Sequence, residues 1–208
     1  YDSYTKCLLH FDGPDGAVVT NDTTGKAVVF LGTAQLDTAQ SKFGGSSLLL
    51  DGNSDYIALY DSDDFSFGVG DFTIDCWVMY NALPVTSTFP PFFSQHQSND
   101  ADFPRTMFFL YNNACTYQLY FVACEGASSD NISTVANLPS TPSTGVWYHV
   151  AVVRSGTTFT TFWNGTQVGT TTSSLSTGNL TGGVRIGTYR GTNKFLNGWI
   201  DEFRISKG

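Results

Sequence analysis

The chain has 208 residues with 18 acidic and 10 basic side chains, a formal charge of −8, and 15% aromatic residues. This aromatic and aliphatic content is too high for a disordered chain, and the acidic balance excludes a nucleic-acid binder, which needs clustered Lys and Arg. The sequence contains no apolar run near the roughly 20 residues of a membrane helix, so we expect no membrane insertion.

Polarity in this chain comes from hydroxyl groups and from aspartate. Ser and Thr together number 46, and Asp supplies 16 of the 18 acidic residues, leaving Glu125 and Glu202 as the glutamates. Asp favours turns, caps and hard metal ions, whereas Glu is the commoner helix residue. The composition therefore predicts an all-β protein with Asp-bearing turns.

The N-terminal third predicts short strands between Asp-Gly turns. The apolar run over residues 7–11 ends at Asp12-Gly-Pro, and a second run covers residues 27–31. Residues 47–50 and 56–60 flank Asp51-Gly-Asn-Ser-Asp55, whose residues tolerate a left-handed backbone. We expect a β-hairpin across this turn.

The middle third alternates between clear and weak strand signals. Residues 72–78 alternate apolar and polar side chains, the pattern of a half-buried strand. Residues 81–105 hold four of the seven prolines and a polar stretch, which predicts a long loop. Strand patterns return over residues 106–111 and 117–123.

The C-terminal third predicts paired strands at residues 146–154 and 158–163, with Asn164-Gly165 as a two-residue turn. Further strands are predicted at residues 184–186 and 199–205, and sustained helical periodicity is absent from the sequence. The first and last strands are both apolar, so we expect them in one sheet. The expected fold is a two-sheet antiparallel β-sandwich, one domain over residues 1–208 that belongs to a longer chain or larger assembly.

The sequence leaves open whether the four cysteines are free thiols or form disulfides. Cys7, Cys76, Cys115 and Cys124 include no CxxC pair, which argues against zinc. Cys7 and Cys76 lie in apolar runs, where a buried free thiol is the commoner state. Cys115 and Cys124 can form a bridge only if the chain folds back between them.

Eight motifs, taken in order, carry a resemblance to a known family. They are Leu8-Leu-His-Phe-Asp-Gly13, Phe43-Gly-Gly-Ser-Ser-Leu48, Leu50-Asp-Gly-Asn-Ser-Asp-Tyr-Ile57, Phe72-Thr-Ile-Asp-Cys-Trp-Val78, Trp147-Tyr-His-Val-Ala-Val-Val153, Trp163-Asn-Gly165, Arg185-Ile-Gly187 and Gly198-Trp-Ile-Asp-Glu-Phe-Arg-Ile205. The chain resembles the laminin-G-like, concanavalin A-like jelly-roll domains, and its start is similar to modules of phage and other virion surface proteins. The resemblance implies a jelly-roll β-sandwich, but the family includes lectins, carbohydrate-binding modules, adhesion domains and glycosidases, so the fold alone assigns no activity.

Catalytic patterns are missing from the sequence. A glycosidase needs two carboxylates that flank the scissile bond. Related jelly-roll enzymes carry them as Glu-x-Asp-x-x-Glu on one strand, whereas both glutamates of this chain stand alone. Nucleophile-elbow and phosphate-loop motifs are also missing. We therefore expect no enzyme.

Calcium is the metal that the residues favour, since it takes about six to eight oxygen ligands. The resemblance implies a structural site where the terminal strands meet the sheet edge. The matching positions are Asp12 and Asp201, completed by a carbonyl of Gly44 or Gly45, with Asp22 as an outside candidate. The alternative is that Asp12 caps a turn and Asp201 pairs with an Arg. Residues 51–55 are a weaker candidate, because a hairpin explains them without a metal.

Sugar recognition pairs an aromatic platform with planar polar side chains. Residues 89–102 and 189–193 have that mixture. The candidate ligand-binding residues are His96, Asp100, Asp102, Arg105, Tyr189, Arg190 and Asn193. We expect His96, Tyr189 and Arg190 to be the more exposed ones, whereas Trp77, Trp147 and Phe203 are assigned to the core, and Phe92 and Phe93 are open between core and loop.

The sequence thus predicts a non-catalytic module of an extracellular or virion surface protein, stabilised by calcium, that binds a glycan or another cell-surface ligand. The alternative is a structural subunit, such as a capsid decoration, tail-fibre or filament protein, that uses the jelly roll to assemble with other subunits. Residues 89–105 and 187–194 discriminate between the two, since assembly would bury them against partner chains.

Overall fold

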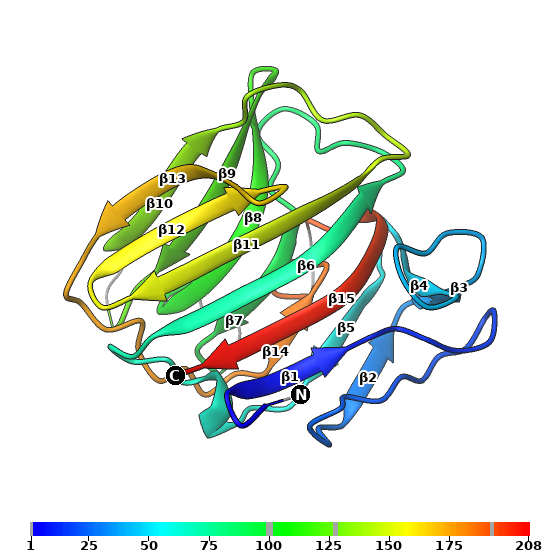
Figure 1. Ribbon diagram of the computed structural model, residues 1–208, viewed down its shortest axis with the longest axis horizontal. Coiled ribbons are helices and arrows are strands. Elements are labelled where there is room, and N and C mark those ends of the chain that lie inside the picture. The colour runs from blue at the N-terminus through cyan, green and yellow to red at the C-terminus, as the bar shows by residue number, and fades with distance from the viewer. Residues whose placement is uncertain (1, 99–101, 127–128, 192–193) are drawn as a thin grey trace.

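The computed structural model describes residues 2–98, 102–126, 129–191 and 194–208. The chain forms two antiparallel β-sheets packed face to face (Figure 1). A single short 3-10 helix, η1 (Asp63–Phe65), is the helical element of these residues. The predicted all-β jelly-roll sandwich is confirmed.

The eight-stranded sheet joins the two ends of the chain. Its strand order is β13-β12-β11-β6-β15-β4-β3, and β1 pairs with the free part of β15. Its strands are β1 (Thr5–Leu9), β3 (Gln35–Asp37), β4 (Ser47–Asp51), β6 (Phe72–Tyr80), β11 (Trp147–Ser155), β12 (Thr158–Trp163), β13 (Thr166–Thr172) and β15 (Asn197–Lys207). The first and last strands lie side by side as predicted, with Leu9 opposite Phe203 (Figure 1).

The seven-stranded sheet has the order β10-β9-β8-β7-β14-β5-β2. Its strands are β2 (Val28–Leu31), β5 (Tyr56–Leu59), β7 (Pro91–His96), β8 (Arg105–Asn113), β9 (Thr116–Ala123), β10 (Ile132–Asn137) and β14 (Val184–Ile186). The two sheets pack through their inner faces, and each leaves one outer face.

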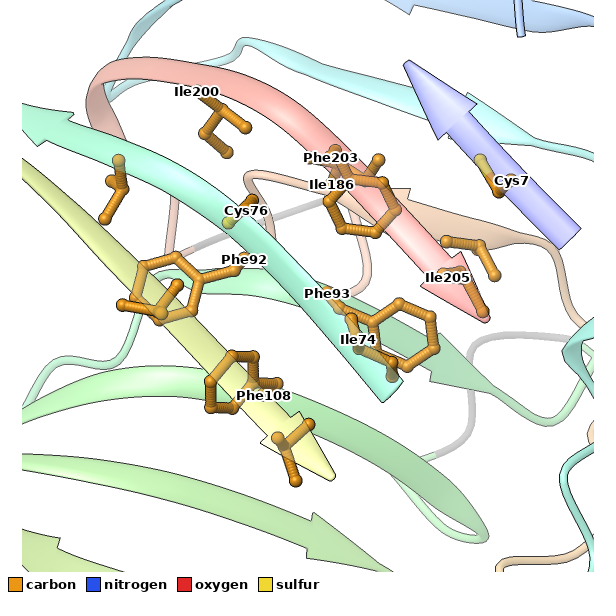
Figure 2. Packing of buried hydrophobic residues seen from close by; sticks show 14 of the residues in the cluster. Cys7, Ile74, Cys76, Phe92, Phe93, Phe108, Ile186, Ile200, Phe203 and Ile205 are labelled. Atoms are coloured by element: carbon orange, nitrogen blue, oxygen red, sulfur yellow. The ribbon is translucent and has the colours of Figure 1, made fainter. Parts of the chain in front are cut away.

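The core lies between the sheets and is rich in phenylalanine (Figure 2). Phe92, Phe93 and Phe108 come from the seven-stranded sheet and meet Phe203 and Ile74 from the other. Fully burying one such side chain contributes about 1.5–3 kcal/mol. Phe203 is therefore a core residue as predicted, and Phe92 and Phe93 join it.

The hairpin predicted across residues 51–55 is wrong. β4 belongs to the eight-stranded sheet and β5 to the seven-stranded sheet, so the turn is an arch between layers. Leu50 and Ile57 are both completely buried in the shared core. Only an arch lets the apolar faces of both strands point into the same space between the sheets.

Two aspartates fix the shape of this arch. Asp51 Oδ1 accepts the N–H groups of the next three non-glycine residues at 2.8–3.2 Å. The buried Asp55 accepts the N–H groups of Thr33 at 2.5 Å and of Asp51 at 3.1 Å. These hydrogen bonds explain the Asp-rich turn without a metal.

The long loop predicted over residues 81–105 contains a buried strand. All six residues of β7 are buried, and β7 lies between β8 and β14 near the middle of its sheet. Pro91 is the first residue of β7, a position where the missing N–H is tolerated. The prolines therefore mark the start of a strand.

All four cysteines are free. Cys7, Cys76 and Cys124 are buried, and Cys115 is exposed on the turn between β8 and β9. The prediction of buried free thiols at Cys7 and Cys76 is confirmed, and the optional bridge between Cys115 and Cys124 is not formed.

Candidate functional site

Several sequence-predicted residues meet above the seven-stranded sheet. The Tyr189 hydroxyl donates to the Asp102 carboxylate, and Arg105 Nη1 lies 3.3 Å from the Tyr189 hydroxyl oxygen. Arg190 Nη1 donates to Asp102 Oδ1 at 2.9 Å. The His96 ring packs edge-on against Tyr189, with ring centres 5.1 Å apart. We call these five residues the tyrosine clamp.

The two rings of the clamp are turned inward, so the predicted exposure of His96 and Tyr189 is wrong. Their exposed fractions are 2% and 7%, whereas Asp102 is exposed and Arg105 and Arg190 are half-buried. His96 ends the buried strand β7, and Tyr189 packs on an aromatic and aliphatic patch of the sheet, Met107, Phe109 and Val122. The other two candidates, Asp100 and Asn193, lie outside the described residues.

The polar side chains of the clamp form hydrogen bonds with one another. Arg105 also forms a two-pronged ion pair with Asp130, at 2.9 and 2.6 Å. The hydrogen bond from Tyr189, together with the charge of Arg190, holds the pKa of Asp102 below its usual value. This network fastens the segment after β14 onto the sheet, and ligand binding by these residues stays a prediction.

The four predicted calcium residues meet at one loop, residues 42–46. The fully buried Asp201 accepts the N–H groups of Lys42 at 2.7 Å and Phe43 at 3.0 Å through Oδ2. Asp12 Oδ1 accepts the Gly45 N–H at 3.1 Å. Gly44 has a φ of +59° and no space for a Cβ beside the Asp12 carboxylate.

These contacts fit a loop anchor better than a cation cage. Asp201 Oδ1 accepts a third N–H, from Glu202 at 2.8 Å, so Asp201 has backbone donors where an Arg partner was the alternative. Burial raises the pKa of Asp201 to about 6, although these N–H groups oppose that rise. Clusters of three or more metal-ligating His, Cys, Asp or Glu side chains are missing from the part of the chain that the structure describes. Calcium binding at Asp12 and Asp201 stays a prediction.

The outer face of the eight-stranded sheet carries a groove that the sequence prediction missed. Two hollows of about 410 Å³ and 560 Å³ adjoin there and share Trp77 and His149 as lining residues. We call this surface the tryptophan groove. Its main lining residues are Asp75, Trp77, Trp147, His149, Glu202 and Arg204.

The groove runs across neighbouring strands. Trp77 of β6 lies opposite His149 of β11, and Asp75 lies opposite Arg204 of β15. Beyond β15, His10 follows β1 and closes the end of the groove. The four strands span roughly 14 Å, since neighbouring strands lie about 4.8 Å apart.

An ion pair and two histidine–carboxylate contacts hold the polar side chains of the groove in place. Asp75 Oδ2 accepts from Arg204 Nε at 3.0 Å, and Asp75 Oδ1 lies 3.5 Å from His149 Nε2. His10 Nδ1 lies 2.8 Å from Glu202 Oε1. Glu202 sits at a register shift of β15 with a φ of +50°, and such bulges turn a side chain away from the regular alternation.

Trp77 is enclosed by the loop that Asp201 anchors. Phe43 meets the Trp77 ring edge-on at 5.8 Å, and Lys42 Nζ lies 4.2 Å from the centre of a Trp77 ring. His149 lies against the same side chain at 5.3 Å. The residues predicted as metal ligands therefore position one wall of the groove.

The assignment of Trp77 and Trp147 to the core is wrong, and strand alternation explains why. Ile74 and Cys76 of β6 point into the core, so Asp75 and Trp77 share the opposite face. In β11, Val150 is in the core, which puts Trp147 and His149 outward. The alternation of residues 72–78 in the sequence indicates this outward direction, whereas residue type alone favours the core.

The described residues contain no helix that is long and apolar enough to cross a membrane. A two-sheet jelly roll with paired chain ends and an aromatic groove on one sheet face defines a lectin-like domain of the laminin G type. The chain belongs to the concanavalin A-like lectin/glucanases superfamily, whose family model matches residues 51–208. Among curated protein sequences, none matches the chain.

Solved structures share this fold at low sequence identity. The binding domain of paraclostridial mosquitocidal protein 1 superposes with a TM-score of 0.71 and 14% identity over 98% of this chain and 49% of that one. The botulinum neurotoxin serotype D binding domain gives 0.71 and 13%, over 98% of this chain and 48% of that one. This chain thus spans about half the length of the toxin binding domains.

One similar structure has the same extent as this chain. It is domain 4 of AbnA, an extracellular GH43 arabinanase from Geobacillus stearothermophilus, in complex with arabinotriose. The TM-score is 0.65 at 18% identity, over 99% of this chain and 94% of that one. At these identities the likeness is one of fold.

Proposed function

We propose that the chain is a non-catalytic carbohydrate-binding module of an extracellular or virion surface protein, and that it holds a saccharide in the tryptophan groove. The observation that carries this proposal is the pair of half-buried tryptophans, Trp77 and Trp147, in two adjoining hollows. Aromatic faces pack against the C–H face of a sugar, and planar polar groups bind its hydroxyls. Asp75, His149 and Arg204 supply such groups.

The shape of the groove favours a saccharide of several linked rings. Two hollows in series and a span of four strands exceed what one ring needs. The arabinotriose complex of the similar AbnA domain supports a short oligosaccharide as the ligand class. We therefore propose an internal stretch of a glycan chain as the ligand.

The carboxylates of the groove support binding without hydrolysis. A retaining or inverting glycosidase needs one protonated carboxyl and one available carboxylate beside the scissile bond. Asp75 is instead paired with Arg204 and His149, and Glu202 with His10. Both carboxylates of the groove are therefore already engaged by basic side chains of the scaffold.

A glycan array followed by calorimetry on its best oligosaccharide tests this function. We expect Trp77→Ala to weaken binding roughly 5- to 150-fold, since removing an aromatic stacking platform costs about 1–3 kcal/mol. The matched control is Tyr111→Ala, which removes a half-buried ring from the outer face of the opposite sheet. Equal affinities for the parent chain and a folded Trp77→Ala protein would refute the groove as the binding site.

We further propose that a structural calcium ion lies at the loop held by Asp12 and Asp201. Both carboxylates are hard oxygen ligands, and both contact residues 42–45. Calcium there would fix the wall formed by Phe43. The ion would have to coexist with the backbone N–H groups that Asp201 already accepts.

A further inference from the structure

The outer face of the seven-stranded sheet holds a hollow of about 390 Å³, separate from the tryptophan groove. It lies over β2, β5 and β14 and is lined by Val29, Tyr56, Ala58, Tyr60, Asp61 and Arg185. We call it the tyrosine hollow. None of these residues belongs to the tyrosine clamp.

A small residue between large ones creates the hollow. Val29, Ala58 and Arg185 stand directly opposite one another on β2, β5 and β14. Tyr56 of β5 and Tyr60, which directly follows β5, flank Ala58 in the lining of the hollow. An extended chain puts the Cα atoms of these two tyrosines about 13 Å apart. The floor is therefore the Ala58 methyl, and the two tyrosines are its walls.

The rim of the hollow is held by the buried strand β7. Gln95 Nε2 donates to Asp61 Oδ1 at 3.3 Å. Gly182 and Gly183 leave no room for a Cβ, because each lies against a backbone carbonyl oxygen of a neighbouring strand. Thr181 directly precedes these two glycines and lines the hollow, so backbone contacts of the scaffold hold this part of the rim in place.

We infer that the tyrosine hollow binds a single neutral sugar ring. Its volume lies near the lower end of ligand pockets, about 300–1,000 Å³, which suits a one-ring ligand. Tyr60 is 73% exposed and gives the ring an aromatic face. Arg185 and Asp61 supply opposite charges for hydroxyl groups, so a neutral ligand is favoured over an ionised one.

The inference goes beyond the proposed function and does not depend on it. The tryptophan groove and the tyrosine hollow lie on different sheets, so either can bind with the other disabled. With both in use, one chain binds an internal glycan stretch on one face and a terminal sugar on the other. Such a module would connect two glycan chains.

Methyl-resolved NMR titration of the full chain tests the inference. The probes are five neutral monosaccharides, namely glucose, galactose, mannose, arabinose and N-acetylglucosamine, each added separately. We expect at least one to shift the Ala58 and Val29 methyl signals saturably. Ala58→Leu fills the floor and Tyr60→Ala removes an exposed wall, and both should abolish the saturable shift of Val29.

Trp77→Ala is the matched control and should leave the Val29 shift unchanged. Unmoved Ala58 and Val29 signals with all five sugars would overturn the inference. A Val29 shift that persists in folded Ala58→Leu and Tyr60→Ala proteins would overturn it as well. The tryptophan groove is read separately, from the Trp77 and Trp147 indole signals with an oligosaccharide, so the two failures are distinguishable.

Discussion

At the residue scale, strand alternation places Trp77 correctly on the outer face of its sheet, whereas its residue type places it wrongly in the core. Tryptophan is usually buried, which favours the core. Its neighbour two positions away, Asp75, is charged, and residues i and i+2 of a strand share a face. The structure follows the strand alternation, and Trp77 lines the groove.

Cysteine chemistry gives a prediction at the same scale. Burial raises the pKa of the Cys7 and Cys76 thiols and also that of Cys124, so the reactive thiolate is disfavoured at each. A thiol reagent such as Ellman's reagent should therefore modify one cysteine, Cys115, in the native chain and all four after denaturation. Cys115→Ser should leave the native chain unreactive, and fast native reaction of more than one thiol would contradict the burial pattern.

The aspartates that hold loops also carry a prediction. Asp55 is 1% exposed and accepts backbone N–H groups of Thr33 and Asp51. Asp55→Ala leaves these donors without a partner, so we expect about 1–3 kcal/mol less unfolding free energy in urea. The control is the exposed Asp63→Ala, expected within about 0.5 kcal/mol of the parent. Equal losses in the two variants would contradict the anchoring role of Asp55.

At the scale of elements, the sequence predicts strands well and their partners less well. β6, β8, β9, β11, β12 and β14 all fall where alternation or apolar runs predict them. The hairpin prediction for the β4–β5 turn is wrong because hairpins and arches use the same turn residues. An arch is distinguished from a hairpin only by the placement of β4 and β5 in different sheets. β7 is missed because its prolines conceal a buried strand that starts at Pro91.

The tyrosine clamp is an element-scale feature with a testable role. Its polar groups bind one another, so we expect it to hold the segment after β14 in place and to leave glycan binding unaffected. Tyr189→Phe removes one hydroxyl and should lower the unfolding free energy by about 1–2 kcal/mol. Calorimetry should give an unchanged affinity for the array-selected oligosaccharide, and a tenfold loss would move the binding site to the clamp.

The loop of residues 42–46 links the predicted calcium site to the groove. If calcium occupies Asp12 and Asp201, calcium should raise the melting temperature relative to a chelator. Asp201→Asn should remove that difference. A calcium-dependent rise in melting temperature that persists in Asp201→Asn would place the ion elsewhere. An unchanged melting temperature of the parent chain would refute calcium binding.

At the scale of the whole molecule, the fold was predictable because many independent motifs agree on it. The paired ends, the Asn164-Gly165 turn and the arrangement in two sheets follow from apolar runs and turn residues. The binding surface was harder, because it forms from residues far apart in sequence, such as Asp75 and Arg204. Only strand register brings such residues to one face.

The two outer faces of the sandwich carry the two proposed sugar-binding surfaces. The eight-stranded sheet presents the tryptophan groove, and the seven-stranded sheet presents the tyrosine hollow. Both are pre-formed by hydrogen bonds and ion pairs of the scaffold, so little ordering entropy is lost on binding. Binding should therefore depend on side chains of the two faces rather than on loop closure.

The indole N–H signals of the tryptophans distinguish a saccharide in the tryptophan groove from one bound elsewhere on the molecule. The chain has four tryptophans, of which Trp77 and Trp147 line the groove, Trp163 is in the core, and Trp199 donates to Asp37 at 2.7 Å. Titration with the array-selected oligosaccharide should shift the Trp77 and Trp147 signals saturably and leave the other two in place. Saturable binding that leaves both groove signals unmoved would contradict the proposal that the tryptophan groove holds the saccharide.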